Sequence, residues 1–279
     1  MLTRKLTTAA VLSGVLLATL SSAPAHAHRA WILPQVTVVA GEDAMVTLEG
    51  AISNDIFIAD YRPFNAASIS AFDHRGAALE IENIYSGRFR THFDLTLANP
   101  GTYRVASASA GMSARWLDTD GNRGFFPGRG QAFNDDALAE AIPGNAEDVQ
   151  ITQVSRRIET FITNGQPDFD VIEPQGVGLE MRYLTHPNDL FSGEIAHFQL
   201  LIDGEPAAGS EVTLIQDGMR YRNQQQDVTF TSNANGELEI PFEEAGMYWL
   251  EARYQDEQAK APATQRSGTY VVTLEVLPE

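Results

Sequence analysis

Histidine is the residue type in this chain that is best suited to chemistry, and that chemistry is metal binding. Neutral imidazole is a favourable ligand for nickel, cobalt, copper and zinc. The 279-residue sequence has six histidines and no cysteine, which excludes thiolate ligands and cysteine nucleophiles. Five histidines follow the first 27 residues, and no two of these five are spaced two or four residues apart: His28, His74, His92, His186 and His197. The sequence therefore offers separate candidate ligands.

His28 stands at the point where an export signal would be cut. Arg4 and Lys5 precede an apolar run, Ala9–Leu20, and the small residues that follow end in the motif Ala25–Ala27. This order is typical of a secretory signal peptide. The apolar run is shorter than the roughly 20 residues of a membrane-spanning helix. We therefore expect residues 1–27 to be removed after Ala27 and the mature protein to be periplasmic.

The new N-terminus would give His28 a property that the other histidines lack. After cleavage it carries an α-amine and an imidazole in the same residue, and these two groups can chelate one metal ion. We therefore predict that His28 is a ligand of a divalent transition metal. Nickel, cobalt, copper and zinc are the candidate ions, because all four accept imidazole nitrogen.

Further histidines would complete such a site, and two positions are predicted to supply them. His186 precedes Pro187 in an expected loop, so we expect its side chain to be exposed. His92 lies in the alternating segment 92–97, whose apolar side chains share the opposite face. The predicted metal ligands are therefore His28, His92 and His186.

Each histidine taken alone also has a simpler interpretation as a structural or solvent-facing residue. For His74 this interpretation is preferred, because His74 lies in the expected turn Asp73–Gly76. It is also preferred for His197, which begins an expected strand. The sequence does not say which of the histidines meet in space.

A second candidate metal motif is the start of a calcium loop. Asp118, Asp120 and Asn122 have the required spacing of oxygen ligands. The sixth position is Arg123 where glycine is expected, and the twelfth is Arg129 where glutamate is expected. These departures favour a plain hairpin turn.

Sequence motifs typical of enzymes are missing. The chain has no G-x-S-x-G, H-E-x-x-H or G-x-x-x-x-G-K-[ST] motif. Only Lys260 remains as a lysine after cleavage, which disfavours Schiff-base chemistry. We predict that the protein is not an enzyme and that its many carboxylates form a solvated surface.

The charge of the mature chain excludes one class of partner. Removing two basic residues with the leader leaves 17 of the 19 lysines and arginines against 37 acidic residues, a net charge of −20. Nucleic acid binding depends on basic side chains that displace counterions, so nucleic acid is not an expected partner. A second apolar span is also missing, so we expect a protein that is not embedded in a membrane.

Short alternating or β-branched runs between turn residues predict an all-β fold. In the first part of the chain, residues 28–115, such runs are punctuated by turns such as Asn99–Gly101 and favour a β-sandwich. Residues 175–279 contain Asp-Gly and Asn-Gly turns between strands, which favour a second sandwich of immunoglobulin or prealbumin type. We expect residues 116–174 to be a loop-rich connection with little helix. Asp136–Ile142 could form one short helix in it. Residues 149–162 could be helix or strand.

Several motifs together resemble an exported bacterial family of unknown function. They are Trp116–Phe125, Gly178–Met181, His186–Leu190, Arg220–Arg222 and Ala245–Ala252, with His28–Trp31 at the start of the mature chain. The family is often described as a periplasmic component of a cobalt or nickel transport system. The resemblance implies a metal ion as cargo. It also implies a membrane permease or a TonB-dependent outer-membrane receptor as partner.

A metal-free function is the main alternative. Immunoglobulin-like sandwiches commonly bind proteins or glycans through loops, and the fold alone does not choose between these. The contact surface would then be the glycine-rich loop 121–130, with Phe125, Phe126 and Arg129. A hydrolase is a third possibility, supported only by the abundance of carboxylates.

Overall fold

The computed structural model describes residues 28–128 and 130–279. The predicted leader, residues 1–27, lies outside these ranges, as does Arg129. The described residues are mostly β-strand with very little helix, so the expected β class is confirmed. No helix in these ranges is long and apolar enough to cross a membrane.

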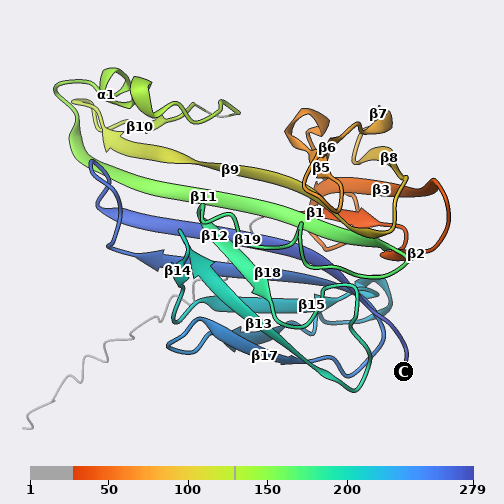
Figure 1. The fold of residues 1–279 in the computed structure, drawn as a ribbon. Helices are drawn as coiled ribbons and strands as arrows, with labels where there is room; N and C mark the ends of the chain where they lie inside the picture. Colours follow the sequence, from red (N-terminus) through yellow and green to blue (C-terminus); the bar gives the residue numbers. More distant parts are fainter. Residues whose placement is uncertain (1–27, 129) are drawn as a thin grey trace, which may run out of the picture.

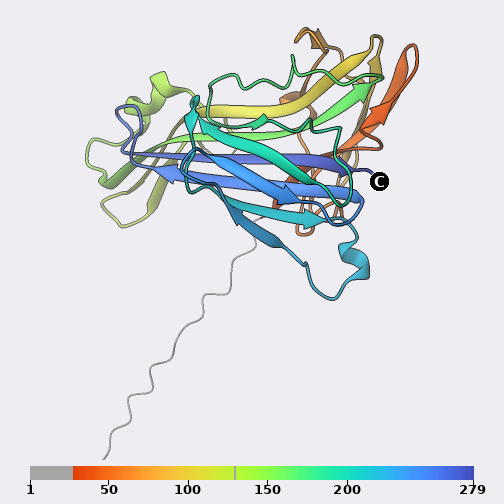
Figure 2. The ribbon, with the colours of Figure 1, turned by 60° about the horizontal axis from the view of Figure 1, so that its bottom comes forward.

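The strands form three sheets that are stacked as layers (Figure 1, Figure 2). The first, the N-terminal sheet, has the order β1-β3-β8-β7, and β4 also pairs with β3. Its strands are β1 (Arg29–Pro34), β3 (Ala44–Ser53), β4 (Arg62–Pro63), β7 (Glu82–Ser86) and β8 (Thr91–Leu97). The alternation of buried and half-buried residues along β8 confirms the predicted period of two.

The second layer, the central sheet, is the largest. Its order is β16-β15-β18-β19-β11-β9-β5-β6, with β10 beside β9 and β2 beside β11. Its strands in chain order are β2 (Val38–Val39), β5 (Ser70–Phe72), β6 (Ala78–Leu79), β9 (Gly101–Leu117), β10 (Arg123–Phe126), β11 (Glu147–Asn164), β15 (Glu211–Gln216), β16 (Val228–Thr231), β18 (Gly246–Asp256) and β19 (Gln265–Val276). Strand β11 runs antiparallel to β9 and parallel to β19, and it joins the two halves of the sheet.

The third sheet has β13 at its centre, and the helical elements are short. This sheet contains β12 (Leu179–Tyr183), β13 (Ile195–Ile202), β14 (Glu205–Pro206) and β17 (Glu237–Pro241). The helical elements are the 3-10 turns η1 (Ala66–Ser68), η2 (Asp135–Ala137) and η3 (Met219–Tyr221), and the one-turn helix α1 (Leu138–Ala141). The short helix expected at 136–142 is therefore present as η2 followed by α1.

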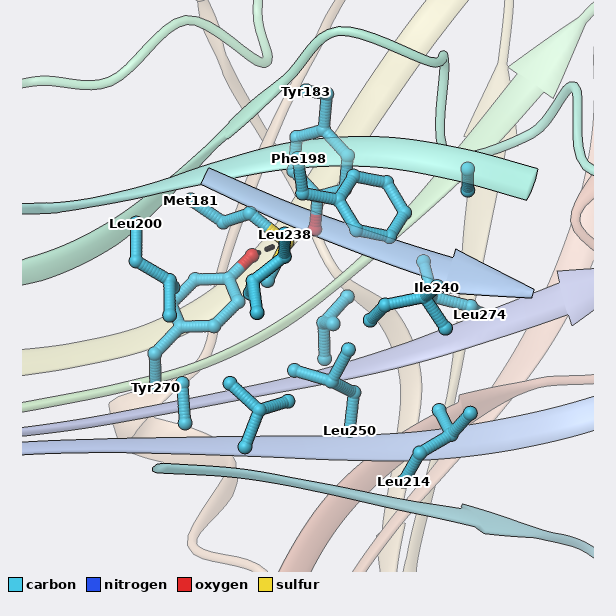
Figure 3. Close-up of a cluster of buried hydrophobic side chains, with 14 of the residues drawn as sticks. Met181, Tyr183, Phe198, Leu200, Leu214, Leu238, Ile240, Leu250, Tyr270 and Leu274 are labelled. Atoms are coloured by element: carbon cyan, nitrogen blue, oxygen red, sulfur yellow. Dashed lines mark hydrogen bonds between the residues drawn. The ribbon is translucent and has the colours of Figure 1, made fainter. Parts of the chain in front are cut away.

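Two hydrophobic cores lie on opposite faces of the central sheet. On β18, Trp249 packs in the core under the N-terminal sheet, and its neighbour Leu250 packs in the core under the third sheet. Val271 and Val272 on β19 divide in the same way. Figure 3 shows the core under the third sheet. Burial on both faces explains why the sequence of the central strands lacks a simple alternation.

The open alternative at residues 149–162 is resolved as strand, because all of them lie in β11. This strand falls in the segment 116–174, which was expected to be loop-rich. The central sheet takes strands from all three ranges, 28–115, 116–174 and 175–279, so the expected arrangement of two separate sandwich domains is not confirmed. The domain boundaries themselves stay predictions.

One of the Asn-Gly turns predicted for residues 175–279 is confirmed at Asn233–Gly236, between β16 and β17. Gly236 has a φ of +77°, and a Cβ there would lie 2.3 Å from the carbonyl oxygen of Leu200. A side chain at this position would meet both backbone strain and a steric clash. The Gly236 amide accordingly donates to the carbonyl oxygen of Asn233 at 2.9 Å, which closes the turn.

Candidate functional site

The imidazole of His28 lies flat on the phenol ring of Tyr61. The ring centroids are 3.7 Å apart and the planes differ by 10°. Strand pairing explains this contact, because β1 and β4 lie on opposite edges of β3 and both begin at its C-terminal end. Arg29 pairs with Ser53 at that end, and Arg62 pairs with Ile52. The residues just before β1 and β4 therefore meet over the end of β3.

A carboxylate adjoins this pair of rings. Asp60 accepts hydrogen bonds from the backbone amide of Asn54 at 2.9 Å and from its side-chain amide at 3.0 Å. Partial burial raises the pKa of Asp60, but these hydrogen bonds and the nearby charge of His28 outweigh that effect and lower the pKa below its ordinary value. Asp60 is therefore an ionised oxygen donor beside an exposed imidazole.

His92 lies on the outer face of the N-terminal sheet, as its alternating pattern predicted. Its Nδ1 is 3.8 Å from Oε2 of Glu49 on β3, and 41% of the side chain is exposed. The same Glu49 oxygen accepts a hydrogen bond from Arg90 at 2.7 Å. His92 thus has one carboxylate neighbour, and that carboxylate is already paired with a guanidinium group.

His186 is buried, so the expectation that it is exposed was wrong. It follows β12 and retains only 4% of its surface, because the loop folds inward against β9 and β11. Its Nδ1 accepts a hydrogen bond from the Asn188 amide at 3.1 Å. Its Nε2 therefore carries the proton and donates it to the Asp168 carbonyl at 2.9 Å, with Thr102 Oγ1 at 3.0 Å.

Both ring nitrogens of His186 are thus engaged in hydrogen bonds. Burial lowers the pKa of His186 below its ordinary value, although the hydrogen bond to Asp168 and the charges of Asp189 and Asp168 act in the opposite direction. The ring is held neutral in a network of polar side chains. This arrangement supports a structural role for His186. Neither ring nitrogen is free to bind a metal, which argues against the predicted role as a ligand.

The two remaining histidines have local partners. His74 lies in the turn after β5, and its Nε2 accepts a hydrogen bond from Nε of Arg75 at 3.1 Å. His197 is on β13 with Nδ1 3.9 Å from Oε1 of Glu239, and half of its side chain (51%) is exposed. Both positions agree with the structural or solvent-facing interpretation.

No group of three or more histidine, aspartate or glutamate side chains within residues 28–128 and 130–279 is arranged to hold a metal ion. The predicted ligands His28, His92 and His186 are therefore not brought together. Side chains alone would not describe the site at His28, however, if the leader is cleaved as predicted, because His28 would then also carry an α-amine. Amine, imidazole and the Asp60 carboxylate would then supply two nitrogens and one oxygen, a donor set suited to nickel, copper or zinc.

Asp60 and Tyr61 were not found from the sequence. Both stand more than 30 residues from His28 and carry no motif. Their position depends on the pairing of β1 and β4 with β3, which is a long-range feature. The only sequence signal in the site was the leader that precedes His28.

The acidic motif at Asp118 is a turn, as expected. Its Oδ1 accepts hydrogen bonds from the amides of Asp120 at 2.9 Å and Asn122 at 2.8 Å. Its Oδ2 accepts one from the Asn122 side chain at 3.0 Å. The carboxylate that would begin a calcium loop instead closes the hairpin between β9 and β10.

A hollow of about 800 Å³ lies at the far end of the central sheet, beside the glycine-rich loop. Phe125 of β10 lines it, and 56% of this side chain is exposed. The lining mixes apolar side chains such as Val154 with polar side chains from adjacent strands, including Ser113, Thr152, Gln265 and Ser267. Figure 1 shows that β10 and α1 lie at this end of the long strands, away from the N-terminal sheet.

A buried charged network lies between the central and third sheets. Arg157 on β11 contacts Glu159 at 3.5 Å and Glu180 at 2.9 Å. Tyr270 donates to Glu159 at 2.6 Å. The hydroxyl of Tyr270 is also 2.7 Å from the hydroxyl of Tyr183 (Figure 3). Glu180 accepts three backbone amides of residues 175–177, so this network anchors the loop before β12.

The chain belongs to a family whose members share a domain of unknown function, DUF4198; the family model matches residues 25–256. No curated protein matches the sequence. Similar solved structures include the D0-D1 domain of intimin, at 9% identity and a TM-score of 0.21, which covers 88% of this chain and 97% of that chain.

Two further structures are similar at the same level. One is the D1-D4 ectodomain fragment of ICAM-5, with 11% identity, a TM-score of 0.22, and 90% of this chain and 51% of that chain covered. The other is the tandem V-type regions of a v-region-containing chitin binding protein, with 10% identity, a TM-score of 0.22, and 87% and 98% covered. Similarity at TM-scores this low does not indicate a function for this chain.

Proposed function

We propose that this chain is an exported accessory protein that binds a divalent transition metal of the nickel or cobalt type and assists its uptake. The metal is held by the α-amine and imidazole of His28 after the leader has been removed, with the Asp60 carboxylate as a further donor. The observation that carries the proposal is the ordered position of an exposed His28 ring against Tyr61. A membrane permease or a TonB-dependent outer-membrane receptor would take the metal onward.

Chelation by one residue explains how the protein could bind a metal although residues 28–128 and 130–279 hold no cluster of three ligand side chains. The α-amine and Nδ1 of an N-terminal histidine close a six-membered ring with the ion. Stacking on Tyr61 limits the rotation of the imidazole, so less side-chain entropy is lost on binding. The ionised Asp60 adds negative charge beside the cation.

The test compares proteins that differ only at the new N-terminus. The chain is produced with its own leader, and mass spectrometry of the exported protein establishes whether His28 is the first residue. Titration calorimetry with nickel, cobalt, copper and zinc then measures binding to this protein and to a variant with one alanine inserted before His28. We expect micromolar or tighter binding that weakens at least about tenfold on insertion, because the amine is moved away from its imidazole.

His92→Ala is the matched control, since it removes another half-exposed histidine beside a carboxylate. We expect its metal affinity to equal that of the unmodified protein. A metal affinity that is unchanged after the alanine insertion would contradict the proposal. Loss of binding on His92→Ala would place the metal at Glu49 and His92 instead.

A second candidate function is a metal-free protein-interaction or glycan-binding module. The exposed Phe125, which lines the hollow together with several polar side chains, favours it, because aromatic rings with amide and hydroxyl neighbours suit a sugar or a peptide. Phe125→Ala would then impair growth as much with ample metal as under metal limitation, whereas the alanine insertion before His28 would leave growth unchanged in both conditions. The reverse result supports the metal proposal.

A further inference from the structure

Four arginines from four strands gather where the N-terminal sheet meets the central sheet. They are Arg29 on β1, Arg62 on β4, Arg156 on β11 and Arg253 on β18, and we refer to them as the arginine group. Arg156 lies near enough to Arg62 and Arg253 for their charges to interact, and Arg29 lies near enough to Arg253 for the same effect. The mature chain has 37 acidic and only 17 basic side chains, so a local excess of positive charge runs against the composition. Such a concentration of guanidinium groups creates a positive potential that attracts anions.

Strand register places two members of the group on one face. Arg156 pairs with Thr269, and Thr269 pairs with Arg253 on the next strand. Their Cα atoms are therefore two strand spacings apart, roughly 10 Å. Both arginines are exposed and lie on the side of the sheet that carries Ile158 and the N-terminal sheet.

The other two members connect the group to His28. The guanidinium carbon of Arg62 is 5.9 Å from the centroid of the Tyr61 ring, on which His28 is also stacked. Arg29 follows His28 directly, and its guanidinium carbon is 5.4 Å from the centroid of the Trp249 ring. The arginine group thus adjoins the position proposed for the metal.

The charges of the group are only partly compensated. Glu251 pairs with Arg253 at 2.6 Å, and Gln225 accepts from Arg29 at 2.9 Å. The carboxylates of Asp227 and Asp55 also lie near enough to Arg29 to offset part of its charge. In the described part of the chain, Arg62 and Arg156 have neither an ion pair nor a side-chain hydrogen bond. Although the Arg156 side chain is exposed, the residues around it displace part of its hydration, and this lowers its pKa. The charges of Arg62 and Arg253 act in the same direction, while Glu251 opposes them.

We propose that the arginine group binds the carboxylates of a small polycarboxylate chelator, so that the metal reaches His28 as an anionic chelate. This inference rests on the proposed function. Guanidinium groups match carboxylate geometry through paired N–H donors, and the donors of Arg62 and Arg156 are free to serve. The metal would share its coordination between the chelator and His28, while the arginine group holds the negative charge that the ion leaves uncompensated.

The test uses citrate as the probe and the mature protein with His28 as its first residue. Calorimetry measures citrate binding to the metal-free protein and to Arg156→Gln, with Arg123→Gln on β10 as a control of the same chemistry and charge change. We expect citrate affinity to fall about tenfold or more in Arg156→Gln and to be unchanged in Arg123→Gln. Thermal unfolding of each variant confirms that Arg156→Gln is folded.

Coupling between the two ligands separates this inference from the proposed function. Nickel should tighten citrate binding and citrate should tighten nickel binding by the same factor. Nickel binding without any citrate binding at millimolar concentration would overturn the anion site and leave the proposed function standing. Inorganic phosphate that binds as tightly as citrate would overturn the choice of a polycarboxylate, as would nickel and citrate that bind without coupling.

Discussion

His28 and Tyr61 form a parallel stack with ring centroids 3.7 Å apart, although 33 positions separate them in the sequence. The contact exists because β1 and β4 begin at the same end of β3. Through it, the residue predicted to become the N-terminus has a defined side-chain position next to the ionised Asp60. The proposed metal chemistry depends on this position.

Removing the ring beneath His28 should weaken metal binding without unfolding the protein. Stacked ring pairs contribute about 0.5–1.5 kcal/mol, so Tyr61→Ala should lower nickel affinity roughly three- to tenfold. Tyr61 is 48% exposed, which predicts little change in the unfolding temperature. Tyr85→Ala, at a 68% exposed position on β7, is the control and should bind as the unmodified protein does. Equal affinities in calorimetry would remove Tyr61 from the site.

Removing the charge of the Asp60 carboxylate tests whether it is a ligand of the metal. Asp60→Asn keeps an oxygen that can accept from Asn54 but removes the negative charge beside the cation. We expect nickel affinity to fall by about tenfold, measured by calorimetry. Asp118→Asn makes the same change in the β9–β10 turn and should have no effect on the metal. An affinity in Asp60→Asn that matches this control argues against coordination by the carboxylate.

His186 should influence stability and its dependence on pH. Its folded-state pKa is lowered, chiefly by burial, so the folded protein favours the neutral ring. The unfolded chain takes up the proton below about pH 6.5, so the contribution of the neutral ring is present above that pH and declines as the pH falls. Stability from urea unfolding should therefore decrease between pH 7.5 and 5.5.

A substitution identifies the source of that loss. His186→Gln should lower stability by about 1–3 kcal/mol at pH 7.5, because buried partners lose their hydrogen bonds. The difference from the unmodified protein should shrink at pH 5.5. Nickel affinity should not change, and a loss of nickel binding by His186→Gln would restore His186 as a ligand.

The buried network under the third sheet predicts a purely structural effect. Tyr270→Phe removes the donor to Glu159, a fully buried contact, and leaves that carboxylate with fewer partners. We expect a loss of about 1–3 kcal/mol in the free energy of unfolding. Tyr221→Phe, at a position that is 89% exposed, should be neutral in the same urea titration. Equal stability of the two variants would contradict the importance of the network.

The β class was predictable from sequence, whereas the way the sheets join was not. The segment 92–97 alternates because one face is half-exposed, and it forms β8 as expected. The strand β11 gave no alternation, since Ile158 and Phe161 contribute to cores on opposite faces. Spacings of three and four residues then resembled a helix. Only long-range pairing with β9 and β19 identifies this segment as the strand that unites the sheet.

Within the site, only His28 could be predicted from the sequence, because only His28 follows a local sequence signal. The predicted leader pointed to His28, but Asp60, Tyr61 and the arginine group come from segments far apart in the sequence and leave no motif. The expected exposure of His186 failed for a related reason. Pro187 correctly indicates a loop, yet the loop packs onto Thr102 and the Asp168 carbonyl in the interior.

The most direct test of the central claim is a crystal structure of the nickel-loaded mature protein, with diffraction data collected at the nickel absorption edge. We predict one anomalous peak at His28, with metal–nitrogen distances of about 2.0–2.1 Å to the α-amine and Nδ1, values typical of imidazole ligands. A peak between His92 and Glu49, or no peak from protein soaked in excess nickel, would contradict the account.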